Sequence, residues 1–531
     1  MAAQSIPPTV VDDMHRPAYG GDLLIRGLSR NPSKPAVYLG DRVLTSAEMA
    51  DEISRWVQAY EAWGITQGSP TAMLAANRPE VLFALGAGMV AGTRGTSLHP
   101  MGSLDDHAYI LEDAGIETLF YDPSAYEQRA MALKERVPGL KRVLALAPTD
   151  AAEDVPTAAA RHGSRRLRPV SASPDTPYSI AYTGGTTGRP KGVVGTYRSM
   201  STMTSIQMAE WEWPDEMRFL CCTPLSHAGA AFFVPTLLRG GSLIVLPHFD
   251  PERVIDTIEK ERITATMLVP TMIYVLLDHP RLGAADLSSL QMLYYGAAAM
   301  SPSRLEEGME RLGPIFFQYY GQAECPMTIT VLRRDEHVAG NRERLATCGR
   351  PVPWLDIALL DDEGHEVAPG DPGEICVRGP LVMKEYLNKP DQTAEAFKFG
   401  WLHTGDVARA DDEGFLTIVD RKKDMIVTGG FNVFPREVED VLSSHPAVSA
   451  AAVIGVPDEK WGEAVKAVVV RRPGSEVAEA ELIALVKDRK GSVSAPKTVD
   501  FVDQIPLSAL GKPDKKALRS QYWDGAERLV N

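Results

Sequence analysis

The segment from Tyr182 to Val193, YTGGTTGRPKGV, concentrates residues suited to binding a phosphate group. It contains four glycines, three threonines and one lysine, namely Gly184, Gly185, Gly188, Gly192, Thr183, Thr186, Thr187 and Lys191. Glycine lets neighbouring N–H groups point at one anion because positive φ costs it little, and hydroxyls and an ammonium group add donors and charge. Pro190 precedes the lysine and Gly192 follows it, which excludes the Gly-Lys-Ser/Thr order of the P-loop. We interpret the segment as a phosphate-binding loop rather than a surface hairpin.

Other segments carry aromatic, carboxylate and histidine side chains that suit a nucleotide or an acyl group. In QYYGQAE, residues 318–324, the ring of Tyr320 can stack on a base and the carboxylate of Glu324 can hold Mg²⁺ against phosphate oxygens. In CTPLSHAGAAFF, residues 222–233, His227 lies on an apolar stretch, where a histidine is more often a satisfied core residue. HTGD, residues 403–406, is a common turn sequence, so it indicates a binding site only in combination with the other segments.

The elements that must position these side chains show the helical and the strand-like spacing of apolar residues. TSAEMADEISRWVQAYEAWG opens with a capping box at Thr45 and Glu48 and predicts an amphipathic helix that Gly64 closes. Strand-like and helical runs then alternate, which predicts a layered α/β fold. After about residue 350, two hairpin patterns turn at Glu363-Gly364 and Glu413-Gly414. A helix-strand-strand-helix order then indicates a compact α+β unit. We predict a large N-terminal domain of several subdomains, residues 1–419, and a small C-terminal domain, residues 420–531.

Charge and cysteine content narrow the class of protein. A formal net charge of −15 disfavours a broad surface for nucleic acid or anionic membranes, so local donors must hold an anionic ligand. The five cysteines have no CxxC spacing and are expected as buried thiols in a reducing compartment. The N-terminus lacks a signal-peptide pattern, and no apolar run reaches membrane-spanning length. These features predict a cytoplasmic protein with no integral membrane association.

Five motifs together resemble the adenylate-forming superfamily, in its acyl-CoA synthetase and fatty-acid–CoA ligase branch. They are TGGTTGRPKGV, CTPLSHAGAAFF, QYYGQAE, HTGD counted together with the following DRKKDMIVTGGFNVFPREVE, and ALGKPDKK. These motifs occur in the family's order across most of the chain. The resemblance implies an ATP- and acyl-binding N-terminal domain, a mobile C-terminal domain, and ATP, Mg²⁺ and coenzyme A as cofactor and co-substrates. Two positions depart from the family pattern, because Gly184 replaces a serine and Ala323 replaces a threonine that donates to the α-phosphate.

The resemblance also assigns the nucleotide site. It implies that the glycine-rich loop binds pyrophosphate oxygens and that Glu324 holds the metal. Asp406 would accept from the two ribose hydroxyls, with Arg421 on the ribose side. Residues near the adenine and α-phosphate would be Gly296, Ala297, Ala298, Tyr320, Gly321 and Gln322. The first three belong to YYGAAA, residues 294–299, which by itself is equally consistent with a tight turn. On the CoA side, Gly429 and Gly430 would line the path of the thiol and Trp461 would stack on adenine or pack in the interior.

Catalytic and acyl-site residues follow from the same resemblance. Lys512 would reach the acyl carboxylate and α-phosphate during adenylation, with Lys515 and Lys516 as solvated neighbours. His227 would lie where the ATP and acyl sites meet. No residue from 228 to 233 can pair with a substrate ammonium, which favours an uncharged chain or ring over an amino acid. An apolar pocket is expected from Phe232, Phe233, Tyr294, Tyr295 and Met327.

The implied reaction has two halves, separated by rotation of the small domain about a hinge at Asp420. A small-molecule carboxylic acid reacts with ATP to give acyl-AMP, and CoA then takes the acyl group. One alternative passes the acyl group to an amine, which gives an amide without CoA. Another treats the chain as a catalytically weak sensor that binds acyl ligands or AMP. Nucleic acid is not an expected partner, and a homodimer stays open because the sequence does not reveal the oligomeric state.

Overall fold

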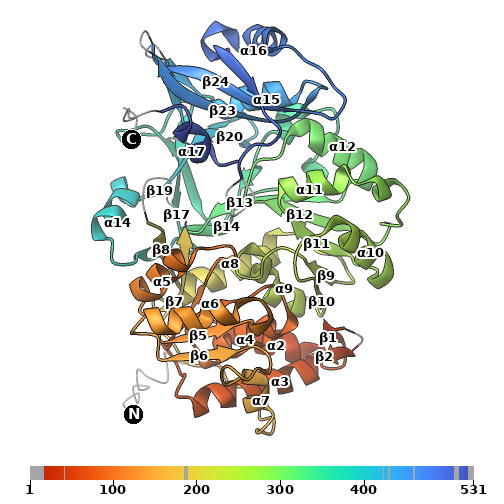
Figure 1. Ribbon diagram of the computed structural model, residues 1–531, viewed down its shortest axis with the longest axis vertical. Coiled ribbons are helices and arrows are strands. Elements are labelled where there is room, and N and C mark those ends of the chain that lie inside the picture. The colour runs from red at the N-terminus through yellow and green to blue at the C-terminus, as the bar shows by residue number, and fades with distance from the viewer. Residues whose placement is uncertain are drawn as a thin grey trace, which may run out of the picture.

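The computed structural model describes residues 17–40, 42–183, 189–421, 424–428, 431–458, 461–507 and 513–523. Figure 1 shows an elongated molecule with the N-terminal elements at one end and the C-terminal elements, in blue, at the other. The strands form four sheets, and the C-terminal sheet lies at the end of the molecule opposite the N-terminal elements. The predicted α/β fold with a large N-terminal and a small C-terminal part is confirmed. The boundary at residue 420 stays a prediction.

The first sheet has seven strands in the order β18-β8-β7-β4-β3-β5-β6. Their bounds are β3 Pro70–Leu74, β4 Arg94–Ser97, β5 Thr118–Tyr121, β6 Arg142–Ala145, β7 Pro177–Thr183, β8 Lys191–Thr196 and β18 Glu385–Tyr386. The helices connecting its parallel strands are α4 Pro79–Ala91, α5 Leu104–Asp113 and α6 Pro123–Arg136, followed by the short α7 Val155–Ala159. Strand β8 runs antiparallel to β7 and pairs Lys191 with Thr183, so the two flanks of the phosphate-loop motif lie opposite each other.

The second sheet has nine strands in the order β15-β14-β13-β12-β11-β9-β10-β1-β2. The strands are β1 Pro35–Leu39, β2 Arg42–Thr45, β9 Arg218–Cys221, β10 Ser242–Val245, β11 Ala265–Leu268, β12 Met292–Gly296, β13 Phe316–Gln322, β14 Cys325–Leu332 and β15 Arg350–Pro351. The main helices here are α2 Gly20–Arg30, α3 Ser46–Ala62, α8 Tyr197–Glu210, α9 Phe233–Leu238, α10 Pro251–Glu261, α11 Pro270–Leu277 and α12 Pro302–Leu312. One buried cluster contains apolar residues of both sheets and joins them into a single body.

Helix α3 begins as the sequence predicts. Thr45 is its N-cap, the Thr45 hydroxyl accepts from the N–H of Glu48 at 3.2 Å, and the Glu48 carboxylate accepts from the N–H of Thr45 at 2.8 Å. After Ala62, Gly64 turns the chain with a φ of +71°. The helix packs Met49, Ile53 and other apolar residues into the cluster that joins the two sheets.

The third sheet is antiparallel and links the large body to the C-terminal part. Its strands are β16 Asp356–Leu360, β17 Gly373–Arg378, β19 Leu402–Ala410 and β20 Leu416–Arg421, in the order β16-β17-β19-β20. The predicted hairpin turns occur at Gly364 and Gly414, which have φ of +84° and +81°. Two short helices, α13 Arg342–Leu345 and α14 Pro390–Ala396, lie in the same stretch of chain.

The C-terminal part has its own sheet and its own core. The strands are β21 Ile426–Thr428, β22 Phe431–Val433, β23 Val448–Asp458, β24 Gly462–Arg471 and β25 Thr498–Phe501. Three helices complete it: α15 Pro435–Ser443, α16 Glu479–Ser494 and α17 Lys515–Ser520. Buried valines and leucines of α15, α16, β23 and β24 form a core separate from the cluster of the large body. Within the part of the chain that the structure describes, no helix is both long and apolar enough to cross a bilayer.

Candidate active site

Three of the predicted nucleotide residues meet where β13 of the second sheet contacts β19 and β20 of the third. Asp406 on β19 is 6% exposed and accepts a hydrogen bond from the hydroxyl of Tyr320 at 2.6 Å. Its other oxygen accepts from Nε of Arg421 at 3.2 Å, because β19 and β20 pair these two residues across the ladder. Burial, together with the carboxylate of Asp406, raises the pKa of Tyr320 well above its usual range. A fixed, buried carboxylate beside an aromatic face suits a ribose and its base.

Two residues that the sequence predicts to bind phosphate or its metal ion, Glu324 and Lys191, are connected through Tyr386, which no sequence motif indicated. Its hydroxyl donates to a carboxylate oxygen of Glu324 at 2.7 Å, and the ammonium of Lys191 lies 4.7 Å from its ring centroid. Strand β18 places Tyr386 opposite Val193 at the edge of the first sheet. Because Tyr386 is 62 residues from Glu324 in sequence, no local spacing could have revealed this contact.

The backbone is tightly packed at the turn between β13 and β14, where Gly321 lies against Met327. A Cβ on Gly321 would lie 2.3 Å from the backbone nitrogen of Met327, and Met327 itself has a φ of +61°. The following residues place Glu324 at the tip of the turn, where its carbonyl accepts from the N–H of Met383 at 2.7 Å. Ala297, after β12, also has a positive φ of +65°, which is uncommon for a residue other than glycine.

His227 lies in the turn after β9, and its ring is mostly buried. Nδ1 lies 2.9 Å from the hydroxyl oxygen of Ser226, and the ring contacts that of His99 edge-on, with 4.9 Å between centroids. Burial, with a smaller contribution from His99, lowers the pKa of His227 to about 4. The ring is therefore neutral at physiological pH.

The predicted acyl-pocket residues separate into two groups. Phe232, Phe233 and Tyr294 are fully buried in the cluster that joins the two sheets, where the ring of Phe232 stacks on Phe219 at 4.6 Å. Tyr295 points to the opposite face of β12, since neighbouring residues of a strand alternate. Its hydroxyl contacts Gln318 and His337 there, so the structure does not bring Tyr295 together with the other candidates.

The predicted hinge residue contacts both the third sheet and the C-terminal part. Asp420 is 6% exposed, and one oxygen accepts from the N–H of Arg421 at 2.6 Å. The other oxygen accepts from the N–H of Arg436 at 3.1 Å, in the first turn of α15. Burial raises the pKa of Asp420 to about 6, against the attraction of Lys515.

Lys515 is not the solvated neighbour that the sequence predicted. Its ammonium pairs with Glu439 at 2.8 Å, and its side chain is only 16% exposed. Burial lowers the pKa of Lys515, but the carboxylates of Glu439 and Asp420 outweigh burial and raise it. Arg519 forms a second pair with Asp424 at 2.8 Å, so two ion pairs hold α17 near the predicted hinge residue Asp420.

Several predicted residues lie outside the described part of the chain: Gly184, Gly185, Thr186, Thr187, Gly188, Gly429, Gly430 and Lys512. Trp461, in the hairpin between β23 and β24, is 41% exposed, which excludes a fully buried packing role. Its function on the CoA side stays a prediction.

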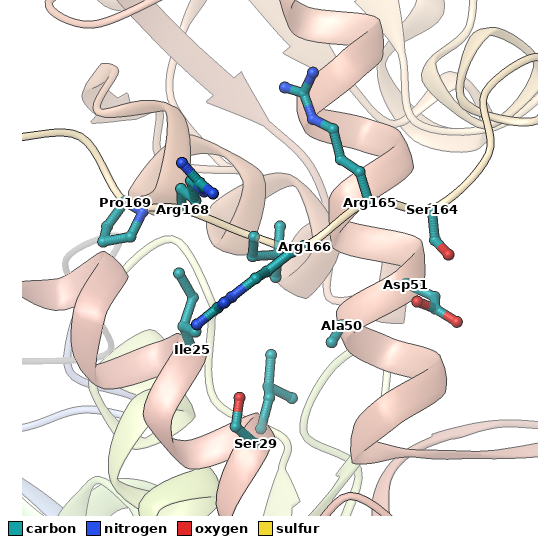
Figure 2. A pocket seen from close by; sticks show the side chains of 11 residues that line it. Ile25, Ser29, Ala50, Asp51, Ser164, Arg165, Arg166, Arg168 and Pro169 are labelled. Carbon is teal, nitrogen blue, oxygen red and sulfur yellow. The ribbon is translucent and has the colours of Figure 1, made fainter.

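A cavity of about 630 Å³ lies apart from these residues, between α2, α3 and the segment 164–169. In Figure 2 the side chain of Arg166 crosses this cavity toward Ile25, whereas Arg165 points away. None of the candidate active-site residues lines it.

The fold and this arrangement define a class of protein. A family model described as AMP-binding enzyme matches residues 25–387, and one described as AMP-binding enzyme C-terminal domain matches residues 437–512. The chain belongs to the AMP-binding enzymes, as its motifs predicted.

Particular relatives are similar over nearly the whole length. The chain is 55% identical to the medium/long-chain-fatty-acid–CoA ligase FadD8 of Mycobacterium tuberculosis, over 97% of this chain and 92% of that protein. It is 37% identical to a feruloyl-CoA synthase of an Amycolatopsis species, over 94% and 99%. Among solved structures, the amide bond synthetase McbA of Marinactinospora thermotolerans superposes with a TM-score of 0.86 at 34% identity, covering 94% of this chain and 99% of that one.

Proposed function

We propose that the protein is an AMP-forming acyl-CoA synthetase that activates a hydrophobic carboxylic acid with ATP and transfers the acyl group to CoA. The observation that carries this proposal is the convergence of Tyr320, Asp406 and Arg421 on one side and Glu324 and Lys191 on the other. A ribose, a base and a polyphosphate need these groups in this order. The 55% identity with a fatty-acid–CoA ligase supports CoA as acceptor.

In the first half of the reaction, a carboxylate oxygen of the acid attacks the α-phosphorus of ATP in line and pyrophosphate leaves. Asp406 orients the ribose and Lys191 stabilises charge on the leaving oxygens, while Lys512 approaches the reacting carboxylate and α-phosphate. Glu324 suits Mg²⁺, because it offers a hard carboxylate oxygen at the tip of a partly exposed turn, and Mg²⁺ neutralises phosphate charge when bound. In the second half, the CoA thiol attacks the acyl carbonyl carbon and AMP leaves.

Both halves use one site, so the small domain must present different residues in turn. We assign the hinge to Asp420, since its side chain joins the last strand of the third sheet to the first turn of α15. Gly429, Gly430 and Trp461 then belong to the thiolation arrangement. All five cysteines are buried as thiols, which supports a reducing, cytoplasmic setting.

For the substrate, we propose a medium- or long-chain fatty acid or an aryl acid. Phe232 and Phe233 follow His227 closely along the chain and are buried with Tyr294 in one apolar cluster. We place His227 where the acid and the α-phosphate meet, and its neutral ring presents no charge to an apolar chain. The named relatives act on fatty and feruloyl groups.

The similarity to an amide bond synthetase makes an amine the second candidate acceptor of the acyl group. Mass spectrometry of products from the purified protein with Mg·ATP and a panel of aliphatic and aryl acids, with CoA or simple amines, separates the two. We expect acyl-CoA and AMP with CoA. Amides formed in preference to thioesters would overturn the CoA assignment, and no acyl-AMP from any acid would support a sensor.

Placing the family's threonine at position 323 tests whether the missing hydroxyl donor slows acyl-AMP formation. The Ala323→Thr enzyme is expected to form acyl-AMP faster by roughly ten- to a hundredfold, since one hydrogen bond to a charged group is gained in the transition state. Pyrophosphate release in single turnover measures this. Ala323→Val adds similar bulk without the hydroxyl, and an equal gain in that variant would show that the hydroxyl donor is not the cause.

The lowered pKa of His227 gives a pH prediction. The imidazole resonances of His227 should not titrate between about pH 5.5 and 8, because burial holds its pKa at about 4. The unfolded chain takes up this proton near pH 6.5, so His227 lowers the free energy of unfolding as pH falls from about 6.5 toward 4. NMR of selectively labelled histidine checks the first statement, and a titration midpoint near 6.5 would contradict it.

A further inference from the structure

A buried group of polar side chains lies directly behind Asp406. Glu374 and Cys376 on β17 face His403 on β19, and Oε2 of Glu374 lies 3.0 Å from Nδ1 of His403. Sγ of Cys376 lies 3.4 Å from the same nitrogen. Glu374 is 6% exposed and Cys376 is fully buried. The strands that carry this group lie between the large body and the C-terminal part (Figure 1).

The pairing of β17 with β19 is irregular at this point. Glu374 pairs with Val407 and Cys376 pairs with His403, so two steps along β17 correspond to four steps along β19. Residues 404–406 therefore bulge out of the ladder, and Gly405 has a φ of +74°. A bulge leaves backbone N–H groups without their ladder partners, and buried N–H groups need other acceptors.

Side chains supply those acceptors. The N–H of Gly405 donates to Oε1 of Glu374 at 2.8 Å, and the N–H of Asp406 donates to the hydroxyl of Thr404 at 3.1 Å. The Thr404 hydroxyl in turn donates to the carbonyl of Ile375 on β17 at 2.8 Å. Thr404 and Gly405 are thus bonded to β17, and Asp406, the last residue of the bulge, is bonded to Thr404.

His403 fixes the carboxylate that holds Gly405. Its Nδ1 faces Glu374, and its Nε2 lies 3.1 Å from the carbonyl oxygen of Lys398, which can only accept. The ring therefore braces Glu374 against a fixed backbone group. Without this brace, a carboxylate on a flexible side chain would not define the position of one N–H.

We propose that Glu374, braced by His403, is a positioning residue that sets the Gly405 bulge and so aims Asp406 at the ribose hydroxyls of the nucleotide. The inference rests on the proposed function, because it takes Asp406 as the ribose ligand. In this proposal Glu374, a buried acid that does not contact the nucleotide, sets the geometry of the ribose contact. Loss of Glu374 then weakens only that part of nucleotide recognition that depends on the hydroxyls.

Comparison of ATP with 2′-deoxy-ATP and 3′-deoxy-ATP tests this directly. The Glu374→Ala enzyme is expected to lose kcat/KM for ATP by about ten- to a hundredfold, because a small displacement of a binding group is costly. The same substitution should have a smaller effect with either deoxy nucleotide, since one of the two ribose contacts is already absent. Equal losses with all three nucleotides would show a merely structural role and would overturn the proposal.

Two further variants sharpen the result. Glu374→Gln should restore discrimination between ATP and its deoxy forms, because its amide oxygen can accept from Gly405 and its NH₂ can donate to Nδ1 of His403. Thr404→Val loosens the bulge from its other end and should also reduce that discrimination, which keeps the test valid if Glu374→Ala does not fold. Glu366→Ala, an exposed acid before β17, is the matched control and should behave as wild type.

A metal ion bound by the same side chains would overturn the hydrogen-bonding role. The atoms of Glu374, Cys376 and His403 lie within 4.8 Å of one another and could together ligate a metal ion. If treatment with 1,10-phenanthroline, followed by dialysis into Mg²⁺, reproduces the Glu374→Ala effect in wild-type protein, the group is a metal site and Glu374 does not act through Gly405 alone. Calorimetry with AMP tests the function on which the proposal rests, because wild-type protein that binds no AMP contradicts that function itself.

Discussion

Replacing Lys512 by alanine is expected to slow acyl-AMP formation by about 10²–10³-fold, which is the usual cost of losing one preorganised charge at a transition state. The same variant should convert preformed acyl-AMP and CoA to acyl-CoA at nearly the wild-type rate. The reason is that the proposed mechanism brings Lys512 to the reacting carboxylate only in the first half of the reaction. Quenched-flow measurement of each half reaction, with separately prepared acyl-AMP for the second, gives both rates.

The neighbouring lysines provide contrasting controls for this experiment. Lys516 is exposed, so Lys516→Ala should leave both half reactions unchanged. Lys515 pairs with Glu439, so Lys515→Ala should lower the thermal stability of the small domain and does not serve as a neutral control. Equal losses of both half reactions in Lys512→Ala would remove the role assigned to Lys512.

The second large effect is expected at Glu324. Glu324→Gln should reduce acyl-AMP formation by about 10²–10³-fold at fixed Mg²⁺ and should raise the Mg²⁺ concentration needed for half-maximal rate, because a charged oxygen ligand becomes neutral. The substitution keeps the side chain's shape, and its amide oxygen can still accept from Tyr386. Titration of Mg²⁺ at saturating ATP measures the change.

A partner substitution separates charge from geometry at Glu324. Tyr386→Phe removes the hydrogen bond at 2.7 Å but keeps the carboxylate charge, so its effect should be much smaller than that of Glu324→Gln. An unchanged Mg²⁺ dependence in Glu324→Gln would show that Glu324 is not a metal ligand, whatever the loss of rate.

The sequence by itself determined the family, the fold class and most of the local structure. Motifs such as TGGTTGRPKGV and DRKKDMIVTGGFNVFPREVE are long enough to predict the family, and the matches to AMP-binding enzymes over residues 25–387 and 437–512 confirm that the chain belongs to it. The capping box at Thr45 and the turn glycines Gly364 and Gly414 act within a few residues of themselves. Local conformational preferences therefore sufficed to predict these elements.

Only the tertiary structure decided which distant side chains meet. Tyr386 joins Glu324 to Lys191, and Lys515 is buried against Glu439, because strands and helices far apart in sequence are packed together. Tyr295 faces away from Tyr294 because strand register, rather than residue type, sets which face a side chain takes. Sequence patterns carry local preferences and family ancestry, whereas long-range contacts depend on packing that no short pattern records.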